Sequence, residues 1–113
     1  MLEIRYEALV TRPEPDALKL KGLIEARGHE ASVEPLMRVV FEDIGPDIFD
    51  GVTAIIATSR NALRALRGSS VLAQARRIRV YAVGSATAEE ARRLGFGQVV
   101  KGPGTADALV PII

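Results

Sequence analysis

Short apolar runs alternate along the chain with longer segments of helical periodicity. Four of these runs are short, and hydroxyl or glycine residues come soon after each of them. The four runs are Ala8–Val10, Ala54–Ala57, Val80–Val83 and Val99–Val100. After each run, apolar residues recur every three or four positions, which is the spacing of one face of an α-helix. A strand followed by a helix, repeated along a chain, is typical of βα units that assemble a parallel sheet.

The pattern predicts the following elements. We expect strands over about residues 4–11, 31–41, 52–57, 79–83 and 98–100, and helices over about 14–27, 60–67, 71–76, 85–94 and 106–113. Gly28 and Gly95 follow two of the helices in the position where a left-handed closing residue is needed. The second strand, in which Val33, Met37 and Val39 alternate with polar residues, is longer than a core strand needs.

The order of elements predicts one α/β domain spanning residues 1–113. Its expected fold is a flavodoxin-like doubly wound parallel sheet of about five strands, with helices on both faces and the first strand between the second and the third. A chain of 113 residues is long enough to bury a core of its own.

Composition and charge narrow the class of protein. The formal net charge of +1 gives no global field that would attract nucleic acid or a membrane, so any selectivity for anions must be local. The chain has one histidine and no cysteine, which leaves no disulfide framework, no metal-binding cluster and no Ser-His-Asp triad. Neither a secretory signal nor a membrane-spanning stretch is recognisable, and a cytoplasmic location is expected.

Hydroxyl residues and cations follow the apolar runs. In a parallel sheet the strand ends meet at one edge, where helix N-termini offer free N–H groups and a partial positive charge. The candidate ligand-binding residues at this edge are Thr11, Arg12, Thr58, Ser59, Arg60, Ser85 and Thr87. They suit a ligand rich in carboxylates or phosphates. The alternative for Ser59 is plain N-capping of a helix, and Lys101–Thr105 is either a flexible loop that closes on a ligand or a simple connection.

Other functions lack their motifs. No acidic pair follows the first strand and no aspartate ends the third, so the phosphoacceptor pocket of a receiver domain is absent. The glycine patterns GxGxxG and GxxxxGK[ST] do not occur. Arg76, Arg77 and Arg79 have no aromatic residues among them, which favours a solvated surface over a nucleic-acid site.

Several of these segments together resemble the uroporphyrinogen-III synthase family. The resemblance rests on Leu9–Asp16, Gly28–Leu36, Ile55–Ala62, Tyr81–Ala88 and Gly104–Ala106, which occur in the family's order. It implies a cytoplasmic enzyme of haem biosynthesis, a lyase without metal or organic cofactor. Such enzymes dehydrate hydroxymethylbilane, invert its ring D and close the macrocycle. The resemblance implies that four residues match family positions lining the substrate cleft: Thr58, Ser59, Arg60 and Thr87. Thr11 and Arg12 match such positions less directly.

The chain resembles only the first half of the proteins in this family. Those proteins have two α/β domains, and their active site lies between the two. The family's candidate acid, a tyrosine of the second half, has no counterpart here. In the family, the first βαβ segment and the residues after it belong to different domains. Two copies of this chain could therefore exchange that segment and form a domain-swapped homodimer. The alternative from another functional class is a non-catalytic flavodoxin-like module that binds a carboxylate-rich small molecule or partner.

Overall fold

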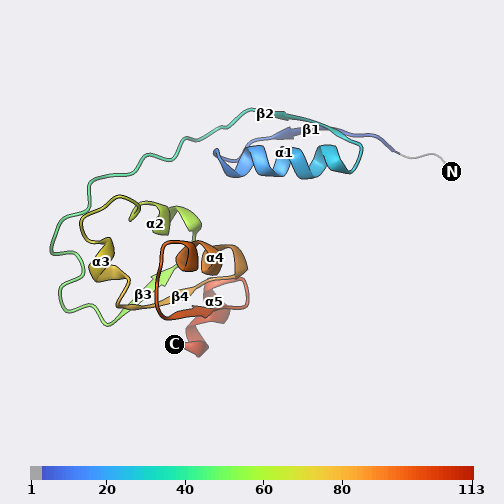
Figure 1. The fold of residues 1–113 in the computed structure, drawn as a ribbon. Helices are drawn as coiled ribbons and strands as arrows, with labels where there is room; N and C mark the ends of the chain where they lie inside the picture. Colours follow the sequence, from blue (N-terminus) through green and yellow to red (C-terminus); the bar gives the residue numbers. More distant parts are fainter. Residues whose placement is uncertain (1–3) are drawn as a thin grey trace. The chain divides into compact units, whose positions relative to one another are not determined.

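The computed structural model describes residues 4–113 and divides them into two compact units (Figure 1). The N-terminal unit comprises residues 4–40, and the C-terminal unit comprises residues 41–113. Both are mixed α/β structures with parallel strands, as the sequence pattern predicts.

The N-terminal unit is a single βαβ element. Its members are β1 (Glu7–Val10), α1 (Asp16–Ala26) and β2 (Glu30–Val33). The two strands pair in parallel, with Glu7 opposite Glu30 and Val10 opposite Val33. Helix α1 packs against both strands, and the residues buried between them are Val10 and Ala17. Gly28 closes the helix with a φ of 86°, the left-handed conformation expected of it.

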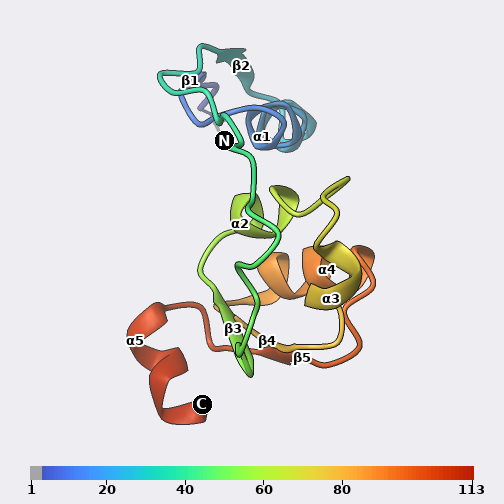
Figure 2. The same ribbon diagram turned by 90° about the vertical axis from the view of Figure 1, so that its left-hand side faces the viewer.

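The C-terminal unit contains a three-stranded parallel sheet in the order β3-β4-β5. Its elements are β3 (Ala54–Ala57), α2 (Arg60–Arg64), α3 (Leu72–Ala75), β4 (Arg79–Ala82), α4 (Ser85–Arg93), β5 (Val99–Lys101), α5 (Ala106–Leu109) and a 3₁₀ turn (Val110–Ile112). Figure 2 shows α2, α3 and α4 together on one side of the sheet, with α5 away from them. The last predicted helix ends early because Pro111 cannot continue an α-helical ladder.

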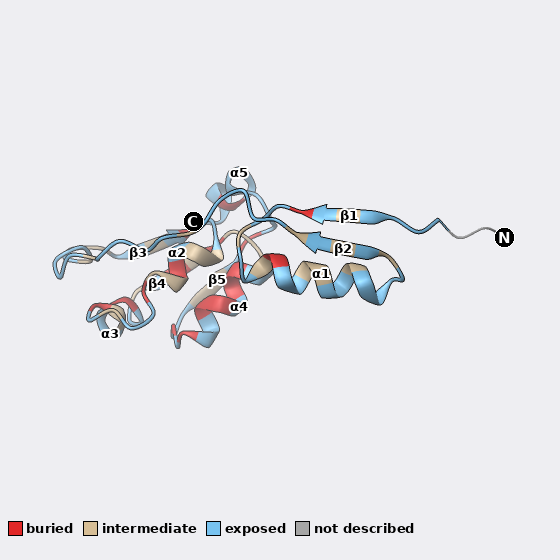
Figure 3. Ribbon diagram, turned by 90° about the horizontal axis from the view of Figure 1, so that it is seen from above, coloured by how far each residue is buried: buried red, intermediate tan, exposed pale blue. Residues whose placement is uncertain are grey.

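The core of the C-terminal unit lies between the sheet and the three helices on that side. Ala57 and Val80 contribute from the sheet, and Leu63 and Ala91 contribute from α2 and α4. In Figure 3 the buried residues gather on α4 and its neighbours, whereas β1 and β2 are mostly exposed. Apolar side chains alternate in and out along β3, so that Ile56 on the opposite face remains 56% exposed.

The predicted five-stranded sheet is wrong. The described residues form two separate parallel sheets, one of two strands and one of three, and β1 does not pair with β3. Periodicity identifies a segment as a strand, but every parallel strand offers the same row of N–H and C=O groups to a neighbour. Which strand becomes that neighbour is decided by tertiary packing.

The predicted long second strand is also wrong. Strand β2 ends at Val33, and residues 34–53 contain no helix or strand. Pro35 lacks an N–H group for a sheet ladder, and the Leu36 N–H instead donates to the Thr11 carbonyl at 3.2 Å. Residues 46–51 form turns. Across the described residues, no helix is long and apolar enough to cross a membrane.

Candidate functional site

The carboxyl ends of β3, β4 and β5 lie at one edge of the sheet of the C-terminal unit, because the three strands are parallel. Thr58–Arg60 follows β3, Gly84–Thr87 follows β4, and Gly102–Thr105 follows β5. The structure therefore brings five of the candidate residues to a common edge: Thr58, Ser59, Arg60, Ser85 and Thr87.

Backbone hydrogen bonds join the loops of this edge. The Gly102 N–H donates to the Ala82 carbonyl at 2.6 Å, and the Gly104 N–H donates to the Val83 carbonyl at 2.7 Å. The Val83 N–H in turn donates to the Ala57 carbonyl at 3.0 Å, which extends the ladder to β3. The loop after β5 is thus anchored to the loop after β4 and is not the freely flexible loop that its glycines suggest.

Gly102 is required at its position by the space around it. A Cβ atom added there would lie 2.7 Å from Leu109 Cδ1 and 2.9 Å from the carbonyl oxygens of Ala82 and Val83. Two of these contacts are with backbone atoms, which cannot move aside cheaply. The close approach lets the chain cross the end of β4 with Leu109 of α5 packed against it. The sequence shows the glycine, but it does not show what surrounds it.

The helices at this edge differ in how their N-termini are capped. Ser59 Oγ accepts a hydrogen bond from the Ala62 N–H at 3.3 Å and caps α2, so the capping role considered for Ser59 is confirmed. Thr105 Oγ1 accepts from the Ala108 N–H at 3.2 Å and caps α5. Helix α4 begins after Gly84, and no side chain caps it. Its first-turn N–H groups and its positive dipole end are therefore available to an anion.

The candidate side chains differ in accessibility. Thr58, Ser59 and Ser85 are exposed, and Arg60 is half-buried. Thr87 is only 4% exposed, because it lies on the face of α4 that packs into the unit. A direct contact between its hydroxyl and a ligand stays a prediction.

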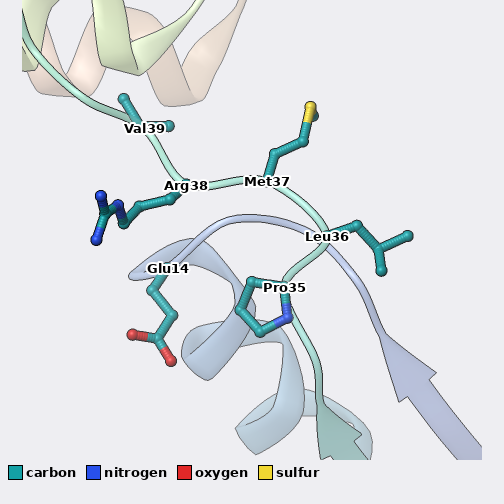
Figure 4. A pocket seen from close by; sticks show the side chains of 6 residues that line it. All are labelled: Glu14, Pro35, Leu36, Met37, Arg38 and Val39. Carbon is teal, nitrogen blue, oxygen red and sulfur yellow. The ribbon is translucent and has the colours of Figure 1, made fainter.

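Thr11 and Arg12 belong to the N-terminal unit. Both are exposed, and they follow β1 directly. They line a shallow, mainly apolar pocket with side chains that include Leu9, Leu20 and Met37. The nearby pocket in Figure 4 is lined by Glu14 and by the segment from Pro35 to Val39, and there Leu36 and Met37 point away from α1.

Sequence reasoning missed one charged residue of the C-terminal unit, Glu90. Its side chain is 1% exposed, on the inner face of α4. Two features of the sequence could have indicated that Glu90 is buried and paired. It lies among the small residues Thr87, Ala88 and Ala91, and Arg93 follows it three positions later, on the same side of a helix. Across residues 4–113, no group of three or more His, Asp or Glu side chains is arranged to hold a metal ion.

Comparison with known proteins matches most of the chain to a family model. The family model described as "Uroporphyrinogen-III synthase HemD" matches residues 19–113. This range includes the whole edge of the C-terminal unit, but it begins after Thr11 and Arg12. No curated protein gives a significant match to the chain.

Proposed function

The chain belongs to the uroporphyrinogen-III synthase family, and we propose that it binds hydroxymethylbilane and takes part in its conversion to uroporphyrinogen III. In this reaction the linear tetrapyrrole loses water from its terminal carbon, ring D inverts through a spiro intermediate, and the macrocycle closes. The substrate carries eight carboxylates. A protein that binds it therefore needs many hydrogen-bond donors and few acceptors.

The observation that carries the proposal is the uncapped N-terminus of α4 at an edge lined with hydroxyls. The free N–H groups of the first turn point out of the helix and carry its partial positive charge. The Ser85 hydroxyl is exposed at the same turn, and Ser59 and Arg60 follow the neighbouring strand. We assign one substrate carboxylate to these donors.

Positioning is the contribution we assign to this edge. The backbone bonds of Gly102 and Gly104 hold the strand-end loops in register, so the donors need little reorganisation when substrate binds. Thr11 and Arg12 would contact other substrate carboxylates. A fixed substrate favours ring closure in one geometry over the spontaneous reaction in solution.

The direct test is the isomer ratio of the product. The purified chain is incubated with freshly generated hydroxymethylbilane, and the oxidised uroporphyrins are separated by chromatography. An excess of the type III isomer over spontaneous type I supports the proposed reaction. Only type I, together with no binding of the substrate, would refute the function for this chain.

Gly84→Asp probes the carboxylate site itself. Gly84 has extended backbone angles (φ −162°, ψ −168°), which a non-glycine residue adopts without strain. An aspartate there would cap α4 and repel the substrate carboxylate, so we expect binding to weaken by about tenfold or more while stability is kept. The matched control is Gly84→Ala, which adds the Cβ without the charge. Titration calorimetry compares the three proteins, and equal affinities would remove α4 from the site.

A binding module without catalysis is the alternative, and one observation favours it. The five edge residues of the C-terminal unit are Thr, Ser and Arg, and none of them is a carboxyl, His or Tyr side chain suited to proton transfer near neutral pH. Tight binding of hydroxymethylbilane with only type I product would support this function and exclude the synthase.

Exchange of residues 4–33 between two copies of the chain is part of the same proposal. Strands β1 and β3 are each paired on one side only, and residues 34–53, which contain no helix or strand, connect the two units. Light scattering at micromolar concentration should then give the mass of a dimer. A monomer would contradict the exchange and leave the carboxylate site untouched.

A further inference from the structure

Charge is distributed unevenly within the C-terminal unit. Residues 60–97 contain eight arginines, no lysine and two glutamates, which gives this stretch a net charge of +6. The stretch comprises α2, α3, β4 and α4. The whole chain has a net charge of only +1, so these helices form a strongly basic part of a nearly neutral protein.

One of the two glutamates is used internally. The Glu90 carboxylate is 1% exposed, and its Oε2 accepts a hydrogen bond from Arg93 Nη1 at 3.0 Å. Its other oxygen, Oε1, has no hydrogen-bond partner and lies 3.9 Å from Arg67 Nη2. Glu90 thus attracts two guanidinium groups, Arg93 of α4 and Arg67 of the turn after α2, and these two arginine side chains stay 64% and 67% exposed.

A third arginine reaches the end of α4 from another segment. Arg76 Nε donates to the Leu94 carbonyl at 2.6 Å. Gly95 makes room for it, since an added Cβ would lie 3.0 Å from the same nitrogen. Arg67, Arg76 and Arg93 are called the arginine surface below.

Favourable interaction with the helix dipole explains only part of this arrangement. Cations near the C-terminus of α4 stabilise the helix through its negative dipole end. A guanidinium has five N–H donors, and Arg76 and Arg93 are each shown to spend one of them on the protein. The side chains are held in place, so their remaining donors could bind a planar anion at little cost in conformational entropy.

We propose that the arginine surface binds an acidic segment of a partner protein through its carboxylates. Carboxylates match the paired donors of guanidinium groups. Nucleic acid is disfavoured because the aromatic residues of this stretch are not exposed: Phe96 is 6% exposed and Tyr81 is half-buried, so bases have no ring on which to stack.

The arginine surface is separate from the candidate substrate site. Ser85 begins α4 and Arg93 ends it, so the two sites lie at opposite ends of a helix roughly 12 Å long. Glu42 and Asp43 line the same shallow pocket as Arg67. The partner's carboxylates should therefore favour the side formed by Arg76 and Arg93. The proposal does not depend on the synthase reaction.

The test measures binding of a short fluorescein-labelled peptide of alternating Glu and Ser by fluorescence anisotropy at physiological ionic strength. Arg67→Gln, Arg76→Gln and Arg93→Gln are combined, and we expect binding to weaken by about tenfold or more. The charge-retaining set, in which the same three residues become Lys, should weaken it by about threefold, because an ammonium lacks the planar fork. The control removes three exposed cations of the N-terminal unit (Lys19→Gln, Arg27→Gln, Arg38→Gln) and should leave binding unchanged.

Arg76→Gln alone separates a loss of binding from a loss of folding. The ion pairs of the buried Glu90 are with Arg67 and Arg93, so this substitution leaves them in place. It should weaken peptide binding by about threefold with an unchanged circular dichroism spectrum. Equal binding by the wild type, the lysine set and the single variant would overturn the proposal. Tighter binding of an oligothymidylate than of the peptide would also overturn it, as would a homodimer that the glutamine set abolishes.

Discussion

The two units use the same strand-helix pattern but bury different amounts of it. In the C-terminal unit, three helices cover one face of a three-stranded sheet, and residues such as Leu63 and Val80 are fully buried. In the N-terminal unit, one helix covers two strands, while Leu9 and Leu23 remain 63% and 58% exposed. An amphipathic pattern therefore indicates which side chains of an element can be buried. The number of elements that pack against it decides which of them are buried.

The difference has a consequence for stability. A two-stranded sheet with one helix buries too little apolar surface to be stable by itself, so the N-terminal unit should open locally at a lower free energy than the C-terminal unit. The two tyrosines report the units separately, because Tyr6 lies in the N-terminal unit and Tyr81 in the C-terminal unit. Their ring signals in NMR spectra can follow each unit through a denaturation experiment.

Truncating a matched leucine in each unit should show the largest contrast. Leu63→Ala removes a side chain that is 1% exposed and should cost about 2–5 kcal/mol of unfolding free energy, because it leaves a cavity in the core. Leu23→Ala removes a 58% exposed side chain of α1 and should cost less than about 0.5 kcal/mol. Urea denaturation followed at Tyr81 and Tyr6 measures both. Equal losses would mean that Leu23 is buried in solution.

The same glycine substitution should have opposite signs in the two units. Gly102→Ala places a Cβ atom within 2.9 Å of two carbonyl oxygens and should cost about 1–3 kcal/mol through overpacking. Gly22→Ala, in the middle of α1 with nothing within 4 Å of the added Cβ, should gain up to about 1 kcal/mol from helix propensity. Thermal unfolding compares the two variants. A stabilising Gly102→Ala would show that the loop after β5 can move away from β4.

Removing a helix cap should give the smallest effect. Ser59→Ala deletes the acceptor for the Ala62 N–H and should cost about 1 kcal/mol. Ser32→Ala changes an exposed serine of β2 and should be neutral within about 0.5 kcal/mol. Differential scanning calorimetry compares the two variants with the wild type. Equal stability of Ser59→Ala and the wild type would show that the Ser59 cap does not stabilise α2.

Much of the candidate site could be predicted from the sequence. Ser59, Arg60 and Ser85 were identified because they follow apolar runs, and a parallel sheet brings such positions to one edge. Gly102 and Glu90 could not be given their roles in the same way. The close contacts of Gly102 come from Ala82, Val83 and Leu109, and Glu90 meets Arg67 from a segment more than 20 residues away.

The sequence by itself determined the parallel α/β character of this protein, the place of nearly every helix and strand, and its membership of the uroporphyrinogen-III synthase family. These properties depend on local periodicity, on capping residues and on short motifs, all of which involve residues close together in the sequence. Only the tertiary structure decided that β1 pairs with β2 alone, that β2 stops at Val33, and that no side chain caps the N-terminus of α4. Strand partners and burial depend on contacts between distant residues, and identical backbone groups on every strand leave that choice open until the chain packs.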